Sequence, residues 1–455
     1  MKNLLKILVI IIGSLLILLI ALVQKIDRTP LQETKHYQAW NNWIVQKEFR
    51  TIQDSLQVGW SKVHIVPDFS APMSGYGDRW GKHFEGIRDS LYVRTISLRT
   101  GDQFMTFLSA DLLLVPPNVT HRLKDLLKIE GISMNEIHLG AIHTHHGVGG
   151  WGQKLLGRLF AGKYDERIEI MLAERMRDAI VQSRLSMRQG HVLYLETEYE
   201  QAVRNRLKVE GATVEDAETR NLIFERIDGQ RAALLTFAAH TTILPADLLK
   251  LSRDYPGITV DSLENSGHYD FAMFFAGAVG SMTYEIDGET PEIRSEQMGQ
   301  QFADHILKHD TSSTTGTTPI VFFSEWVPVP LPPATLRIDI NYALRPWVFN
   351  SLFGSSPGDI KVSLIDRTLV LGMPADFSGE IMVELDAYAR SKGLDLIVTS
   401  FNGNYMGYIT HDQHYEENMY ETVTMSWNGY QAGDYYTQVS KDIIDKIAKN
   451  FTLNR

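Results

Sequence analysis

The stretch of sequence that decides the fold runs from Phe104 to Trp151 and reads FMTFLSADLLLVPPNVTHRLKDLLKIEGISMNEIHLGAIHTHHGVGGW. Its hydrophobic periodicity predicts a strand over 104–111, a helix over 120–131 and a second strand over 137–142. Two strands joined by a helix form a βαβ unit, and ligand sites in such sheets lie beyond the carboxyl ends of the strands. The residues at that place, 143–145, read His-Thr-His. We therefore expect an α/β fold, with mixed sheets flanked by helices and the site at strand ends.

The rest of the chain continues this alternation of strands and helices. Apolar residues at helical spacing predict helices, and short apolar runs bounded by turn residues predict strands. The expected elements are a helix over 165–185, strands over 191–199, 232–240 and 271–278, a helix over 291–309, a hairpin around Asp366-Arg367, a helix over 378–392 and a strand over 394–400.

Residues 310–319, DTSSTTGTTP, are the best candidate for a surface linker. The stretch VPVPLPPAT at 327–335 cannot be an interior strand, because proline lacks the N–H donor that a sheet needs. A boundary near residue 315 is one interpretation of this pattern. We expect a single domain over residues 29–455, with the linker on its surface.

Composition excludes several classes of site. The chain has 455 residues and no cysteine, so it has no disulfide and no thiolate metal site, and a metal would need His, carboxylate or Tyr ligands. Its 44 basic and 55 acidic residues give a net charge of -11, without a basic run that could follow a phosphate backbone. We therefore expect no nucleic-acid partner.

The apolar segment from Leu4 to Val23 is long enough to cross a bilayer, at about 30 Å of helix. Lys2 and Lys6 precede or begin it, and no clear cleavage site follows, which favours an uncleaved signal anchor over residues 1–28. The alternatives are a signal peptide that is removed, leaving a secreted protein, and a buried core helix. We expect the remaining chain on the non-cytoplasmic side, periplasmic or extracellular.

Histidines stand at two predicted strand ends. His143 and His145 follow one strand and precede Gly147, Gly149 and Gly150, which permit close approach of the backbone to a ligand. His240 ends the apolar run AALLTFAAH. Metal ligation is one interpretation, and solvated or hydrogen-bonded structural histidines are the other.

Other strand ends carry hydroxyls and a carboxylate. AGAVGSMTYE at 276–285 places Ser281 and Thr283 after two glycines, in a turn that either exposes catalytic groups or is an ordinary glycine turn. Asp376 lies between a strand and a helix N-terminus, where it is either a functional carboxylate or a simple cap. The tyrosine-rich segment 402–421 is either functional or a mobile loop.

Four motifs occur in a fixed order along residues 60–445. They are H-T-H-x-G-x-G-G at 143–150, the pair Asn205-Arg206, an apolar strand that ends at His240, and a tyrosine motif from Tyr408-Ile409-Thr410 through Tyr415 to Tyr420-Glu421. The set resembles the catalytic domain of the neutral/alkaline non-lysosomal ceramidases, zinc amidohydrolases that cleave the N-acyl bond of ceramide. The immunoglobulin-like C-terminal domain of full-length members is expected to be absent.

The resemblance implies a Zn²⁺ ion held by His143, His240, Asp376 and Tyr408. Asp376 replaces the family's glutamate, and it remains a competent zinc ligand although it is one methylene shorter.

The resemblance also places His145, Arg206 and Tyr420 around the scissile carbonyl. There Arg206 and Tyr420 would stabilise negative charge, while His145 would pass a proton to the leaving amine. Thr283 stands at the position of the family's catalytic serine and Ser281 two residues earlier. Because the methyl group of Thr283 would hinder direct attack, water activated by the metal is favoured over a covalent hydroxyl nucleophile.

The expected function is a membrane-anchored zinc amidohydrolase of ceramidase type. It would hydrolyse ceramide or a related lipid amide to a fatty acid and a sphingoid base or amine. Two alternatives stay open: a zinc hydrolase of another N-acyl lipid, an ester or an envelope peptide, and a non-catalytic lipid-binding protein with the same fold.

Overall fold

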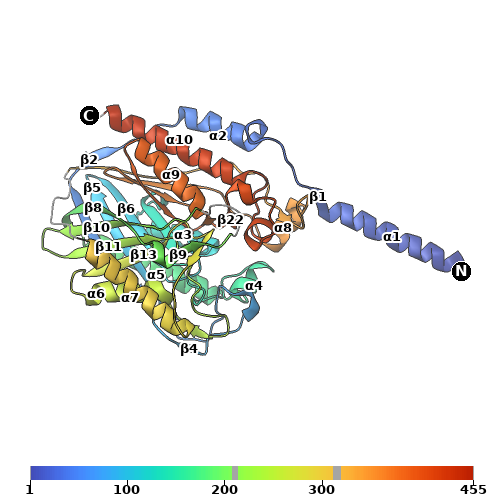
Figure 1. The fold of residues 1–455 in the computed structure, drawn as a ribbon, viewed down its shortest axis with the longest axis horizontal. Coiled ribbons are helices and arrows are strands. Elements are labelled where there is room, and N and C mark those ends of the chain that lie inside the picture. The colour runs from blue at the N-terminus through green and yellow to red at the C-terminus, as the bar shows by residue number, and fades with distance from the viewer. Residues whose placement is uncertain (1, 208–213, 311–318, 454–455) are drawn as a thin grey trace.

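The computed structural model describes residues 2–207, 214–310 and 319–453. Two β-sheets pack face to face, and helices cover the outer face of each (Figure 1). The α/β class with mixed sheets is therefore confirmed. The expected linker at 310–319 lies, apart from its two end residues, outside the described residues.

The larger sheet has eight strands. Its two outer pairs are parallel, and the strands between them are antiparallel. The order is β13 (Phe271–Ala276), β11 (Arg231–Phe237), β10 (Glu218–Arg226), β8 (Arg188–Glu198), β3 (Leu56–His64), β5 (Tyr92–Thr100), β6 (Gln103–Ala110) and β7 (Ile137–Ala141).

The smaller sheet has five strands and one parallel pair, β19 with β21. The predicted hairpin is its centre, because β18 and β19 pair around Asp366-Arg367. The order is β2 (Ile52–Asp54), β15 (Ile320–Val327), β18 (Ile360–Ile365), β19 (Thr368–Gly372) and β21 (Asp395–Thr399). As expected, β15 ends before the prolines that follow it.

A continuous core fills the space between the sheets. Phe107 and Phe224 of the larger sheet meet Phe322 and Val370 of the smaller one, and all four are fully buried. Apolar burial of this extent is the main stabilising contribution to such a fold. Sequence on both sides of residue 315 therefore contributes to one core.

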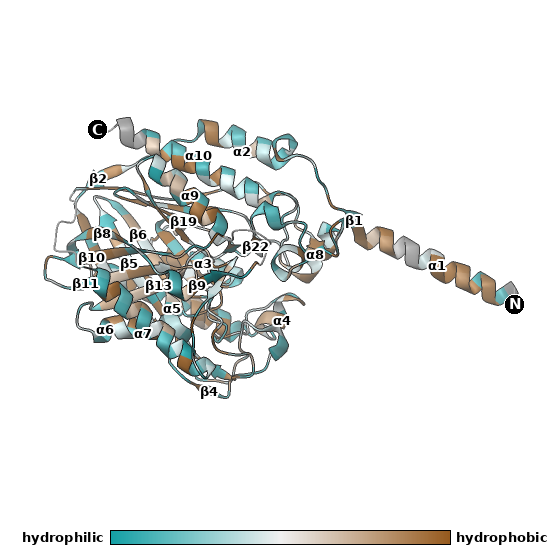
Figure 2. Cartoon of the chain, in the orientation of Figure 1, coloured by the Kyte–Doolittle hydropathy of each residue, from teal (hydrophilic) through white to brown (hydrophobic). Residues whose placement is uncertain are grey.

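The outer helices bury one apolar face each and leave the other to solvent, as the colours of Figure 2 show for α6, α7 and α10. Two pairs cover the larger sheet, and the others cover the smaller one. The pairs are α3 (Pro117–Ile129) with α5 (Glu166–Leu185) and α6 (Asp254–Asn265) with α7 (Pro291–His309), and the others are α2 (Lys35–Gln46), α9 (Gly379–Ser391) and α10 (Ala432–Leu453).

The βαβ unit that the sequence predicts is present as β6, α3 and β7, with parallel strands. Two other strands end earlier than predicted, because β11 stops at Phe237 and β13 at Ala276. Consequently His240 and residues 277–281 lie in loops. This difference matters for function, since loops at strand ends can bring side chains from distant strands together.

Short elements connect these loops. The strand β9 (Val203–Asn205) pairs with β14 (Met282–Tyr284), and β20 (Asp376–Phe377) pairs with β22 (Tyr408–Ile409). The helices α4 (Gly157–Ala161) and α8 (Pro346–Leu352) lie at the same end of the molecule (Figure 1).

The N-terminal helix α1 (Lys2–Leu22) projects away from the folded body at that end (Figure 1). Its span from Asn3 to Leu22 is long and apolar enough to cross a membrane, and none of it is buried against the rest of the protein. A buried core helix, one of the alternatives from the sequence, is therefore wrong, while a signal anchor and a signal sequence both fit this arrangement.

Candidate active site

The loops after four strands, each a member of a parallel pair, meet at one place. His143 follows β7 and His240 follows β11, while Asp376 follows β19 and Tyr408 follows β21. The carboxyl ends of β19 and β21, which pair in parallel, lie at one edge, so the loops that follow them become neighbours there. The pairing of β20 with β22 sets Asp376 directly beside Tyr408.

Three imidazoles converge through their Nε2 atoms. The Nε2 of His143 lies 3.0 Å from that of His240, and the Nε2 of His145 lies 3.3 Å from each of them. The rings of His143 and His240 are buried, at 3% and 2% exposure. Among the described residues these three histidines form a group that could hold a metal ion.

The outer nitrogens of two of these rings point to backbone carbonyls. His143 Nδ1 lies 2.7 Å from the Leu113 carbonyl oxygen, and His240 Nδ1 lies 3.2 Å from that of Val279. A carbonyl only accepts hydrogen bonds, so each Nδ1 carries the proton and each Nε2 presents a lone pair. Burial lowers the pKa of His143 to about 3 and that of His240 well below its usual value, so both rings are neutral.

The backbone at His143 is strained. Its φ of +62° lies in the left-handed region, which costs a non-glycine residue on the order of 1 kcal/mol. Phe401, also at positive φ (+67°), stacks on the His143 imidazole with a centroid separation of 4.2 Å. Packing and the Leu113 hydrogen bond together hold the ring in this strained position.

Asp376 completes this group with a carboxylate. Its Oδ1 is buried without a hydrogen-bond partner among the described residues and lies 3.3 Å from His143 Nε2. Its Oδ2 accepts a hydrogen bond of 2.9 Å from the Tyr405 hydroxyl. Burial raises the pKa of Asp376 to about 7, although the hydrogen bond from Tyr405 and the nearby Arg206 both act to lower it.

These donors fit a zinc ion. Ligands at about 2.0–2.1 Å from a tetrahedral zinc lie roughly 3.3 Å from one another, and His143 Nε2 lies 3.0 Å from His240 Nε2 and 3.3 Å from Asp376 Oδ1. The lone pairs of His143 and His240 and the unpaired Asp376 oxygen would repel one another without a cation. His145, for which the sequence suggests a proton-transfer role, lies as close as the predicted ligands.

Arg206 joins the predicted site from the residue directly after β9. Its Nη2 donates hydrogen bonds of 2.7 Å to the Gly280 carbonyl and 3.2 Å to the Tyr408 hydroxyl, and its Nε lies 3.3 Å from the Glu421 carboxylate. Burial raises the pKa of Tyr408 well above its usual value, and the neighbouring guanidinium of Arg206 acts against this rise. The Tyr420 ring lies 6.1 Å from that of Tyr408 and is half exposed.

Ser281 and Thr283 occupy different environments. Ser281 is fully buried, and its hydroxyl bonds to the Ser378 hydroxyl at 3.1 Å and accepts from the Gly379 amide at 3.0 Å. It thereby caps α9 in place of Ser378, whose side chain makes no capping bond of its own. Thr283 lies in β14, is partly exposed, and faces Arg204 of β9 in the register.

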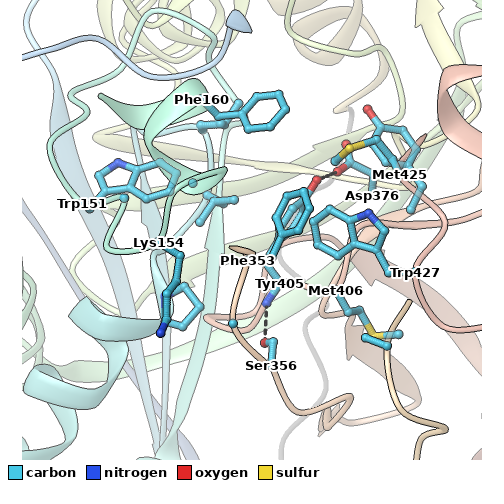
Figure 3. A pocket seen from close by; sticks show the side chains of 18 of the residues that line it. Trp151, Lys154, Phe160, Phe353, Ser356, Asp376, Tyr405, Met406, Met425 and Trp427 are labelled. Atoms are coloured by element: carbon cyan, nitrogen blue, oxygen red, sulfur yellow. Dashed lines mark hydrogen bonds between the residues drawn. The ribbon is translucent and has the colours of Figure 1, made fainter. Parts of the chain in front are cut away.

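A cavity of about 400 Å³ opens beside these groups. His143, His145, Asp376, Tyr408 and Tyr420 are among the polar residues that line it. Its remaining wall is mainly apolar and aromatic, as Figure 3 shows, and includes Trp151, Phe160, Phe349, Phe353, Met406, Met425 and Trp427. Such a cavity suits an apolar chain whose polar end reaches the histidines.

Several functional contacts are absent from the sequence-based set. Tyr405 holds Asp376, and its hydroxyl points toward that carboxylate in Figure 3. The many tyrosines in residues 402–421 indicated that this segment could be functional, but they did not single out Tyr405. Glu421 belongs to a recognised motif, yet its contact with Arg206 needed the fold. The contacts of the Leu113 and Val279 carbonyls with His143 and His240 could not be predicted from the sequence, because every residue has a backbone carbonyl.

Comparisons with known proteins show the family and the fold of this chain. The model of the neutral/alkaline non-lysosomal ceramidase N-terminal region matches residues 57–319, more than half of the chain. A search of curated protein sequences found no match to this chain.

Two similar solved structures share the fold. One is the neutral ceramidase from Pseudomonas aeruginosa, 17% identical, with a TM-score of 0.73 over 87% of this chain and 75% of that one. The other is described as a ceramidase complexed with C2, 16% identical, with a TM-score of 0.75 over 87% of this chain and 76% of that one. The chain belongs to the neutral/alkaline non-lysosomal ceramidase family.

Proposed function

We propose that the protein is a zinc-dependent amidohydrolase of ceramidase type. The observation that carries this proposal is the convergence of neutral imidazole Nε2 atoms and an unpaired Asp376 oxygen at the polar end of an apolar cavity. Membership of the ceramidase family supports the reaction class, hydrolysis of an N-acyl amide.

His143, His240, Asp376 and Tyr408 are the proposed zinc ligands. When bound, zinc would polarise the amide carbonyl and lower the pKa of a water molecule. The hydrogen bonds at the two Nδ1 atoms fix the rings of His143 and His240 in the orientation that ligation needs. Tyr405 does the same for Asp376, by occupying Oδ2 and leaving Oδ1 free.

Arg206, Tyr420 and His145 are the proposed catalytic groups. Arg206 and Tyr420 lie on the side of Tyr408 and can donate hydrogen bonds to the carbonyl oxygen as it gains negative charge. His145 has an Nδ1 without a hydrogen-bond partner among the described residues, and burial lowers its pKa well below the usual value. The neutral ring can therefore take a proton from the attacking water and pass it to the leaving amine.

Water is the proposed nucleophile. The Ser281 hydroxyl is already engaged with Ser378 and Gly379, so its role is to hold the loop and α9. Thr283, which lies opposite Arg204, is assigned a supporting role, because its β-branched side chain resists the rotation that direct attack requires.

The proposed substrate is ceramide or a related lipid amide, which is cleaved to a fatty acid and a sphingoid base or amine. The apolar wall of the cavity supports an acyl chain, and one similar structure is described as a ceramidase complexed with C2. We further propose that α1 anchors residues 29–455, as one domain, on the non-cytoplasmic side of a membrane.

The decisive experiment measures metal content and turnover of the purified full chain. Fluorescent ceramide in mixed micelles should release its fatty acid, a chelator should stop the reaction, and added zinc should restore it. Zinc without ceramide turnover would move the substrate to another N-acyl lipid, an ester or an envelope peptide, which a substrate panel would identify. Absence of both metal and turnover would contradict the enzyme and favour a lipid-binding protein.

A further inference from the structure

The membrane-length helix α1 is fastened to the folded body at its C-terminal end. The Arg345 amide donates to the Leu22 carbonyl at 2.8 Å, and the Arg345 Nε donates to the Ile20 carbonyl at 3.1 Å. Both carbonyls belong to the last turn of α1. Carbonyl groups in the last turn of a helix have no N–H partner within the helix, so Arg345 supplies the missing hydrogen bonds. Immediately afterwards, β1 (Val23–Lys25) pairs with β17 (Tyr342–Leu344), which also pairs with β16 (Leu336–Arg337).

The same residues lead directly to the cavity. Arg345 is the N-cap of α8, whose Phe349 lines the cavity together with Phe353 one residue beyond the helix. The helix α4, which contributes Gly157 and Phe160 to the opposite wall, lies at the end of the molecule from which α1 emerges (Figure 1). The cavity is therefore built next to the point where the chain would leave a membrane.

Large apolar side chains are exposed at this end of the molecule. Trp347 of α8 is 57% exposed, and the β16–β17 hairpin exposes Ile338, Ile340 and Tyr342 at 51%, 42% and 42%. Tryptophan and tyrosine are the residues that membrane proteins place at the level of lipid headgroups. We call these four residues the hairpin–α8 face.

The dimensions also agree. A helix of the length of α1 spans about 30 Å, the thickness of a bilayer's hydrocarbon layer. If α1 crosses a bilayer, its end at Leu22 marks the membrane boundary, and the paired strands β1 and β17 follow without a flexible spacer. The hairpin–α8 face then lies in the headgroup region.

We propose that the hairpin–α8 face is a docking surface for the lipid bilayer that α1 crosses, and that it holds the cavity against that bilayer so that a lipid amide enters without passing through water. Charged groups of both signs contact this face, because Arg28 donates to the Ile340 carbonyl and Asp339 accepts from the Tyr342 amide, so burial of apolar side chains carries the docking. The inference rests on the membrane anchoring in the proposed function and on neither zinc nor turnover.

Site-specific fluorescence tests the docking surface. The chain has no cysteine, so single substitutions such as Ile340→Cys and Trp347→Cys accept one environment-sensitive dye each. The labelled full chain is placed in phosphatidylcholine nanodiscs with and without doxyl-labelled lipid, which quenches nearby dyes. A dye at Leu19→Cys in α1 shows whether the helix lies in the bilayer. The matched control is Leu185→Cys, because Leu185 is an exposed leucine at the C-terminal end of α5.

We expect the dyes at residues 19, 340 and 347 to lose most of their emission to the lipid quencher and the dye at 185 to keep it. Quenching at 19 without quenching at 340 and 347 would overturn the docking surface while leaving the anchor intact. A dye at 19 that is not quenched would overturn the anchor and the inference together. Dyes at 340 and 347 that shift to the blue without lipid quenching would show a protein partner and overturn the bilayer as the occupant.

Discussion

The two sides of the candidate active site are built in different ways. The imidazole side, His143, His145 and His240, follows strands of the eight-stranded sheet, and backbone carbonyls orient two of its rings. The carboxylate–phenol side, with Asp376 and Tyr408 as its proposed ligands, follows the five-stranded sheet and is held by side-chain hydrogen bonds. The family match at residues 57–319 includes the imidazole side and ends before Asp376 and Tyr408 of the carboxylate–phenol side.

Burial has opposite consequences on the two sides. It lowers the pKa of the histidines, which keeps them neutral and ready to bind a cation at neutral pH. On the other side it raises the pKa of Asp376 to about 7 and that of Tyr408 well above its usual value, so the charge there depends on pH and on what is bound. The imidazole side is therefore preorganised, and the carboxylate–phenol side is adjustable.

Removing a ligand from the imidazole side should have the largest effect. His143→Ala or His240→Ala should lose zinc and activity together, because three remaining ligands seldom hold zinc tightly. Metal analysis and turnover of the purified variants check this, with His121→Ala, an exposed histidine of α3, as the control. Full activity in either variant would contradict the ligand assignment.

His145 gives a sharper version of the same test. His145→Ala should keep zinc and lose turnover if the side chain transfers protons, whereas loss of zinc would make it a ligand. The two results separate the sequence-based role from the proximity of its Nε2 to the other two rings.

The next effect concerns Arg206, which lies between the two sides. Arg206→Lys should preserve folding and zinc but reduce turnover on the order of 10²-fold, because an ammonium group cannot reproduce the fixed geometry of the guanidinium. The control is Arg204→Lys in β9, two residues before Arg206, where Arg204 is half exposed and pairs with Glu285. An unchanged rate in Arg206→Lys would indicate a structural role only.

A smaller effect is expected on the carboxylate–phenol side from Tyr405→Phe. The Tyr405 hydroxyl stabilises ionised Asp376, so its removal should raise the pKa of Asp376 further and weaken zinc binding by about tenfold. A carboxyl with a higher pKa is protonated at higher pH, so the pH at which half of the zinc is released should move upward. Tyr388→Phe, which loses a similar bond to Asp445, should leave that pH unchanged.

The smallest changes are expected at the two hydroxyls. Thr283→Ala should slow turnover a few-fold without abolishing it, and Ser281→Ala should mainly cost about 1 kcal/mol of stability through the lost α9 cap. Rates and thermal unfolding measure the two effects. An acyl-enzyme trapped on Thr283 or Ser281, seen by mass spectrometry after rapid quenching, would instead show covalent catalysis.

The elements of the fold were largely predictable because their signals are local. Periodicity predicted α3 and β7, and the turn at Asp366-Arg367 predicted the β18–β19 hairpin. Strand ends were less predictable, as β11 and β13 show, because apolar residues continue past the last ladder hydrogen bond into a buried loop. Burial alone therefore does not mark the end of a strand.

By itself, the sequence determined which chemical groups the protein can use: histidines at strand ends, a carboxylate, tyrosines and no thiol. It also determined the family through the order of its motifs. Only the tertiary structure decided that three Nε2 atoms face one another, that Tyr405 holds Asp376, and that Ser281 caps a helix instead of facing the cavity. The physical reason is that most of these contacts join loops far apart in the sequence, 29 residues for Tyr405 and Asp376 and up to 98 for the others, so their geometry depends on how two sheets pack and on no local propensity.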